Sequence, residues 1–154
     1  METSFILGAE ESRIKKPYNI LGMPTYLKIA AKDTNGHMSM FYGDYRRNQG
    51  PPLHQNGDLE EIFYIIEGEF IFQLGDKKVK AVAGTTIFIP RMMPHTFLVT
   101  SEVGRTLFIL SPSGKIEELF AKYDSFQTIP PVEELMRVSE ELGFPVIGPP
   151  ITED

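Results

Sequence analysis

Side chains that bind metals or move protons gather in one stretch, "GPPLHQNGDLEEIFYIIEGEF", which covers residues 50–70. His54 and Asn56 are two positions apart, and side chains of an extended strand alternate between its faces, so both are predicted to point the same way. Glu61 can join them after the bend at Gly57 and Asp58. Three polar groups from one segment are therefore expected to converge.

A second segment, "GTTIFIPRMMPHTFL", begins its last strand at His95. If the two segments are neighbouring strands, His95 can face His54 across the interior of the domain. Two neutral imidazoles and one carboxylate suit a divalent first-row metal with open coordination positions. The alternative is that each histidine is a hydrogen-bonded structural residue, and this is our interpretation of the third histidine, His37.

Short strands must bring these residues together, and the sequence from residue 25 to residue 111 predicts such strands. Apolar runs rich in β-branched and aromatic residues alternate with turn signals, among them Asn35-Gly36, which is typical of a tight hairpin. Eight to ten closely spaced strands indicate an all-β fold, an antiparallel barrel or jelly roll. The predicted strands include 62–66, 70–74 and 78–82.

After Pro112 the hydrophobic period changes to that of helices. One helix is expected after an N-cap at Ser113, with Ile116, Leu119, Phe120 and Tyr123 on its apolar face. A second helix ends at Gly143, and its apolar stripe comprises Val132, Leu135, Met136, Val138 and Leu142. Both helices are predicted to pack outside the barrel, and the tail "FPVIGPPITED" is predicted to be extended without forming a strand.

The length, composition and net charge of the chain limit the kinds of protein that it can be. The chain has 154 residues, the size of one domain, and we expect residues 1–154 to form a single domain, with the barrel at 25–111 and the helical segment at 113–143. Cysteine is absent, which excludes disulfides and thiolate chemistry. A net charge of −6 argues against a nucleic-acid partner. No long apolar stretch or signal peptide is visible, so the prediction is a cytoplasmic protein without a membrane contact.

The two segments resemble the paired motifs of the cupin superfamily, in particular small single-domain cupins related to quercetin dioxygenases. The first motif of that family is G-x5-H-x-H-x(3 or 4)-E-x6-G. His54, Glu61 and Gly68 fit it, Asn56 stands where the second histidine belongs, and Gly50 only approximates the leading glycine.

The second motif is G-x5-P-x-G-x2-H-x3-N. Gly84, Pro90 and His95 fit it, while Met92 replaces the glycine and Val99 replaces the asparagine. Both motifs occur in order and at the family spacing. The resemblance is close from about residue 51 to residue 111, and the C-terminal helices also resemble those of this subgroup.

The resemblance implies a β-barrel that holds a metal through three histidines and one glutamate. In this chain the set would be His54, Asn56, Glu61 and His95, with a divalent ion such as Fe, Mn, Ni or Zn. An amide oxygen is a weaker donor than imidazole, so affinity is expected to fall and the choice of metal to shift away from Cu. A site that has lost its metal and keeps only hydrogen bonds is the alternative.

Apolar side chains in phase with the candidate ligands predict a pocket for a small apolar or aromatic molecule. The candidates are Met40, Tyr42, Phe63, Phe72 and Phe97, for which the alternative is an ordinary core role. By resemblance the protein is expected to be a metal-dependent dioxygenase-like enzyme in which Glu61 is the catalytic base.

Two other functions stay open. One is a non-catalytic cupin that binds a small molecule as a sensor or carrier. The other, a sugar isomerase, is disfavoured because the positions expected to point inward are mainly apolar. A homodimer is also expected, with the N-terminal segment "SFILG" as an edge strand for a partner; the alternative is that Phe5–Leu7 pairs within its own sheet.

Overall fold

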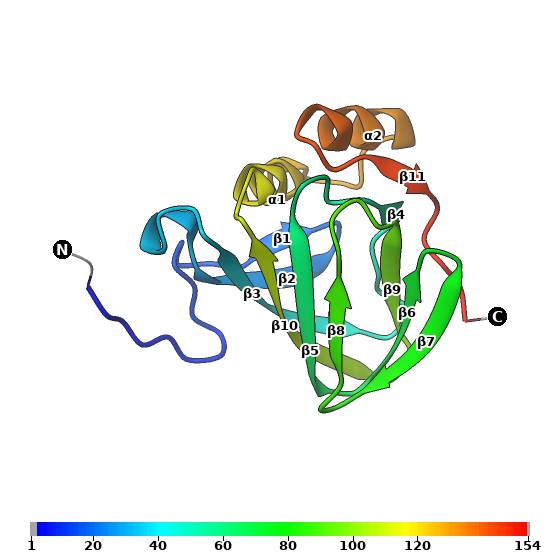
Figure 1. Ribbon diagram of the computed structural model, residues 1–154, viewed down its shortest axis with the longest axis horizontal. Helices are drawn as coiled ribbons and strands as arrows, with labels where there is room; N and C mark the ends of the chain where they lie inside the picture. Colours follow the sequence, from blue (N-terminus) through cyan, green and yellow to red (C-terminus); the bar gives the residue numbers. More distant parts are fainter. Residues whose placement is uncertain (1–2, 154) are drawn as a thin grey trace.

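Two antiparallel sheets face each other in a computed structural model, which describes residues 3–153 (Figure 1). The six-stranded sheet has the order β1-β2-β3-β10-β5-β8, and the five-stranded sheet has the order β11-β4-β9-β6-β7. Two helices follow β10 in the chain, precede β11 and lie at one end of the sandwich. The predicted jelly roll with two C-terminal helices is confirmed.

The elements have the following bounds. The six-stranded sheet contains β1 (Tyr18–Ile20), β2 (Met23–Ile29), β3 (Ser39–Arg46), β5 (Glu60–Glu67), β8 (Thr86–Ile89) and β10 (Val103–Ser111). The five-stranded sheet contains β4 (Leu53–His54), β6 (Glu69–Leu74), β7 (Lys77–Val82), β9 (His95–Val99) and β11 (Val146–Gly148). The helices are α1 (Ile116–Ser125) and α2 (Val132–Glu141), and a short 3-10 turn covers Ala31–Asp33.

Phenylalanine rings fill the space between the sheets. Phe41 is fully buried and stacks on Phe108 with ring centroids 5.1 Å apart, and Phe63 meets Phe72 edge to face at 5.0 Å. Each such side chain contributes about 1.5–3 kcal/mol through burial alone. The sandwich is therefore held together by an aromatic core that extends from α1 to the candidate ligands.

Helix α1 packs as its apolar spacing predicts. Ile116, Leu119, Phe120 and Tyr123 are all buried, and the Phe120 ring lies 4.8 Å from that of Phe41. The expected N-cap is wrong, however. Lys115 occupies the cap position without a side-chain hydrogen bond, while Ser113 is buried and accepts a hydrogen bond from Ser39 Oγ. Ser113, three residues before the helix, thus pairs with the buried Ser39 hydroxyl instead of capping the helix.

Helix α2 buries less of its apolar stripe than predicted. Leu135 and Val138 are buried, but Val132 is 64% exposed and Met136 is 41% exposed. Gly143 has φ +92°, the left-handed conformation that commonly ends a helix, as its position predicts. The exposed part of the stripe faces a groove that is described below.

The C-terminal tail does form a strand, contrary to the prediction. Residues 146–148 make up β11, which pairs with β4, and the flanking prolines take part through their carbonyl groups. Leu53 N–H donates to Pro149 O and Gln55 N–H donates to Pro145 O. Proline lacks a donor but still accepts, so a proline-rich segment can cover a sheet edge.

Two further expectations concern the N-terminal third of the chain. The connection of β2 to β3 is not a tight hairpin: the 3-10 turn precedes Asn35 and Gly36, which have φ +55° and +80°. Residues 3–8 form no strand, and Ile6 is 96% exposed, so the pairing of this segment within its own sheet is wrong. Strand exchange with a second copy stays a prediction.

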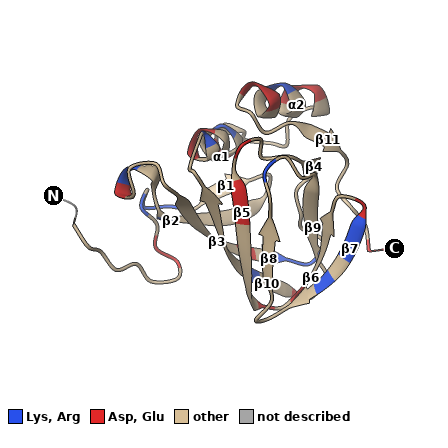
Figure 2. Cartoon of the chain, in the orientation of Figure 1, with Lys and Arg blue, Asp and Glu red and all other residues tan. Residues whose placement is uncertain are grey.

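Apart from the buried Glu61, the charged residues named here lie on the outside of the sandwich. Figure 2 shows acidic residues along both helices and lysines along β7. Within residues 3–153 no helix is long and apolar enough to cross a bilayer. The absence of a nucleic-acid partner and the cytoplasmic location stay predictions.

Candidate metal centre

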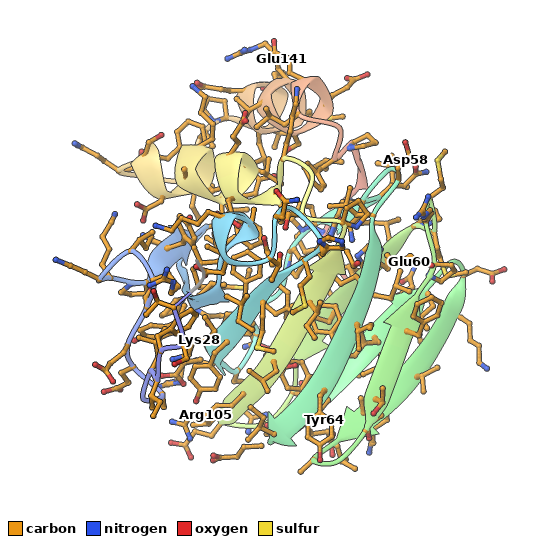
Figure 3. The ribbon with its side chains drawn as sticks, turned by 60° about the vertical axis from the view of Figure 1, so that its left-hand side comes forward. Lys28, Asp58, Glu60, Tyr64, Arg105 and Glu141 are labelled. Carbon is orange, nitrogen blue, oxygen red and sulfur yellow. The ribbon has the colours of Figure 1, made fainter. Side chains whose placement is uncertain are left out.

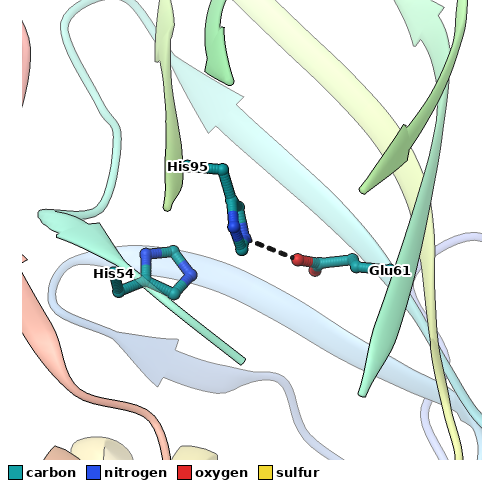
Figure 4. Close-up of side chains that lie close together, drawn as sticks. All are labelled: His54, Glu61 and His95. Atoms are coloured by element: carbon teal, nitrogen blue, oxygen red, sulfur yellow. Dashed lines mark hydrogen bonds and ion pairs between the residues drawn. The ribbon is translucent and has the colours of Figure 1, made fainter. Parts of the chain in front are cut away.

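Three strands bring the candidate ligands together between the sheets (Figure 4). His54 ends β4 and is the direct register partner of His95, the first residue of β9. Glu61 is the second residue of β5 in the facing sheet. One ligand atom from each residue lies within 4.8 Å of the others, and the two imidazole rings are 4.4 Å apart.

Backbone carbonyls orient both imidazoles. His54 Nδ1 lies 2.8 Å from Pro52 O, and His95 Nδ1 lies 2.8 Å from Met93 O. A carbonyl oxygen can only accept, so each Nδ1 carries the proton and each Nε2 is left to face the centre. This is the arrangement that holds a metal-ligating histidine in its reactive tautomer.

The pair formed by His95 and Glu61 needs a positive charge. His95 Nε2 lies 3.0 Å from Glu61 Oε1, at side chains that are almost fully buried. Because Nδ1–H is committed to a carbonyl, a neutral His95 would place a lone pair against a carboxylate. Either a proton shared between them or a bound cation resolves this contact.

His54 is held neutral. Burial, together with the adjacent His95, lowers the pKa of His54 to about 3, and the Pro52 carbonyl opposes this shift only in part. A neutral imidazole is the form that binds metal. The donor set therefore fits a divalent cation: two Nε2 lone pairs and one buried carboxylate converge on one point.

The lowered pKa of His54 predicts that acid destabilises the metal-free protein. Between pH 6.5 and about 3 the unfolded chain binds a proton at His54 that the folded chain does not. The free energy of unfolding therefore falls as the pH drops through this range, by up to about 1.4 kcal/mol per pH unit from this group. Denaturant titrations at several pH values should show a shallower fall for His54→Gln than for the unchanged protein. Equal slopes would contradict the assignment.

The Asn56 side chain lies at the site, but its amide nitrogen, and not its amide oxygen, faces Glu61 and His95. The side chain is 4% exposed, and Nδ2 lies 2.8 Å from Glu61 Oε1 and 3.3 Å from His95 Nε2. The expectation of an amide oxygen among the ligands thus differs from the structure, where the amide donates to the carboxylate. An ionised glutamate attracts the donor end of an amide, and strand spacing carries no information on that choice.

The acidic residues next to Glu61 are less buried than Glu61, as the alternation of side chains along a strand requires. Glu61 is buried, while Glu60 is only partly buried and Asp58 is exposed in the preceding turn; Figure 3 labels both of the latter at the upper end of β5. Because side chains alternate along the strand, Glu61 points into the interior and Glu60 does not.

The expected pocket residues divide into two groups. Phe63, Phe72 and Phe97 do point between the sheets, where they pack on one another with centroids 5.0–5.7 Å apart. Met40 and Tyr42 do not: they alternate with the buried Ser39, Phe41 and Tyr45 and lie on the other face of β3.

The phase of β3 was ambiguous because each of its faces carries two apolar or aromatic residues, Phe41 and Tyr45 on one and Met40 and Tyr42 on the other. Sequence reasoning consequently missed Tyr45, which is buried, stacks on Phe97 at 5.7 Å and shares a 2.9 Å hydrogen bond between its hydroxyl and Thr25 Oγ1. The small residue Gly43 was the available signal, since the Tyr45 ring lies directly over it.

A two-sheet sandwich with two histidines and a glutamate between its sheets can be compared with known proteins. The family model described as "Cupin domain" matches residues 44–110, which include all three candidate ligands. Residues 44–110 therefore match the cupin domain, and the two-sheet fold of the chain is that of a cupin β-sandwich.

Solved structures share this fold at low sequence identity. The polyketide cyclase RemF from Streptomyces resistomycificus aligns with a TM-score of 0.60 at 20% identity, over 72% of this chain and 81% of that one. A predicted oxalate decarboxylase from Thermotoga maritima aligns with a TM-score of 0.58 at 19% identity, over 61% and 87%. KdgF from Halomonas sp. aligns with a TM-score of 0.54 at 16% identity, over 59% and 79%.

One curated sequence relative is the uncharacterized protein MJ1618 of Methanocaldococcus jannaschii, which is 42% identical over 43 residues. This match spans 28% of the chain and only about a third, 34%, of the relative. The structural neighbours are varied small cupins, so the resemblance holds at the level of the superfamily rather than of quercetin dioxygenases specifically.

Proposed function

We propose that this cupin binds a divalent first-row metal through His54, Glu61 and His95 and is a dioxygenase-like enzyme. Its substrate would be a small aromatic or enolisable organic molecule. The observation that carries the proposal is the 3.0 Å contact of His95 Nε2 with Glu61 Oε1, at a ring whose Nδ1–H is already donated to Met93 O. A cation at the point where the His54 ring also converges would satisfy that contact.

Each residue has a distinct role in this proposal. His54, Glu61 and His95 would hold the metal, which would supply a Lewis acid for an oxygen of the bound molecule. Glu61 accepts a proton from a substrate hydroxyl at a carboxylate oxygen, and the Asn56 amide keeps that carboxylate in place through its 2.8 Å hydrogen bond. The packed rings of Phe63, Phe72 and Phe97 exclude water from this side of the centre.

A non-catalytic binding protein is the second candidate. Two observations favour it: a third histidine is replaced by Asn56, and the phenylalanines beside the centre fill the interior by packing ring on ring. In that case the centre would recognise a ligand, or remain a structural hydrogen-bonded cluster, without turnover.

Metal analysis combined with an oxygen electrode separates the two. Protein purified without chelator is expected to contain close to one metal ion per chain and to consume oxygen when a flavonol is added. A chelator should abolish both, and re-addition of the metal should restore them. Protein that retains metal but never consumes oxygen with flavonols or diketones would favour the binding protein, and protein that binds no metal at all would overturn the proposal.

A further inference from the structure

An apolar groove lies next to β4, and none of the candidate metal ligands lines it. Its volume is about 570 Å³, in the range of small-molecule sites. Four segments form its walls: Leu21 between β1 and β2, the approach to β4, residues 129–136 at the start of α2, and β11 with the prolines that follow. Every residue that lines it is Gly, Pro, Val, Leu, Ile or Met.

Large apolar side chains are left uncovered along this groove. Ile129 is 74% exposed, Val132 is 64% exposed and Ile147 is 46% exposed; the first two lie at the start of α2 and the third lies in β11. Concave clusters of this kind mark ligand sites more often than isolated exposed side chains do. The charged side chains of α2 are not among the residues that line the groove.

The groove shares backbone with the candidate metal centre. Pro52, which lines it, accepts the hydrogen bond from His54 Nδ1 at 2.8 Å. Val146, which also lines it, is the register partner of His54 in the pairing of β11 with β4. A molecule in the groove would therefore lie against the segment that orients one imidazole.

We propose that this groove binds a neutral, apolar small molecule directly behind His54. No side chain that lines it can pair with a charge or donate a hydrogen bond, which selects against ionic and strongly polar ligands. Its hollow shape favours a compact ligand over the flat surface of a folded partner. This inference rests on the groove alone and holds whether or not the centre is catalytic.

The neutral dye N-phenyl-1-naphthylamine, which fluoresces in apolar surroundings, serves as the probe. The full chain is expected to bind it saturably at one site. Val132→Glu places a charge on the wall formed by α2, and Ile147→Glu places one on the wall formed by β11. Each substitution should weaken dye binding at least tenfold. Val82→Glu, at a 48% exposed valine at the end of β7, is the matched control and should leave the affinity within twofold.

Imidazole NMR signals of metal-free protein then locate the probe. With only three histidines in the chain, the His54 signal can be assigned through His54→Gln, and it is expected to move on addition of the dye while that of the exposed His37 does not. Thermal unfolding of each variant verifies that it is folded.

Three results would overturn the inference: no saturable binding of the dye, an equal loss of dye affinity in Val82→Glu, or a dye-induced change of the NMR signal at His37 alone. Light scattering provides a fourth such result. If the unchanged protein is a dimer that does not bind the dye, and Val132→Glu makes it a monomer, the groove is an interface between two copies.

Discussion

Glu61→Gln is expected to weaken the binding of a divalent metal at least about 100-fold. Loss of a residue that merely supports a ligand costs about 10–100-fold, and this substitution removes the only carboxylate of the cluster. Glutamine keeps the shape of the side chain, so the fold should survive. Competition with a chromogenic chelator, or titration calorimetry, measures the affinity.

The adjacent Glu60→Gln is the matched control, because that carboxylate lies on the other face of β5. It removes the same charge one residue away and should change the affinity less than threefold. If Glu61→Gln binds metal as tightly as the unchanged protein, or if the two variants lose affinity equally, Glu61 is not a ligand.

Asn56→His is expected to raise metal affinity by roughly tenfold or more, which is about 1.4 kcal/mol. Imidazole is a stronger donor than an amide for Fe, Ni or Zn, and position 56 already lies within hydrogen-bond distance of Glu61 and His95. Metal content after dialysis and calorimetric titration both report the gain. If Asn56→His consumes oxygen with a flavonol faster than the unchanged protein, the low metal affinity that Asn56 causes also limits catalysis in the unchanged protein.

Gln55→His controls for the mere addition of an imidazole to the same loop. Residue 55 is one position out of phase with the cluster, and its backbone N–H is engaged by Pro145 O, so its side chain should not join the site. A gain in Gln55→His equal to that in Asn56→His, or no gain in Asn56→His, would contradict the geometry described above.

The parts of the fold that follow from strand and helix periodicity could be predicted from the sequence. Alternation along β5 separates Glu61 from Glu60, and the spacing of four apolar residues defines the buried face of α1. His54 and His95 could be paired because both begin or end strands beside turn residues. These signals are local, and burial of one face determines the outcome.

Other features depend on contacts that a single segment does not specify. The strand β11 exists because the edge of β4 is open to it, and the phase of β3 is set by packing between sheets and not by its own apolar pattern. The orientation of the Asn56 amide depends on the charge of its neighbour Glu61. Sequence patterns could not show any of these three, since each requires knowledge of what lies across the domain.

The most direct test of the metal proposal is anomalous X-ray diffraction from crystals of protein loaded with a first-row metal, recorded at the absorption edge of that metal. The account predicts one strong peak within about 2.5 Å of His54 Nε2, His95 Nε2 and a carboxylate oxygen of Glu61. Metal-soaked crystals that show no peak there, with His95 still hydrogen-bonded directly to Glu61, would contradict it.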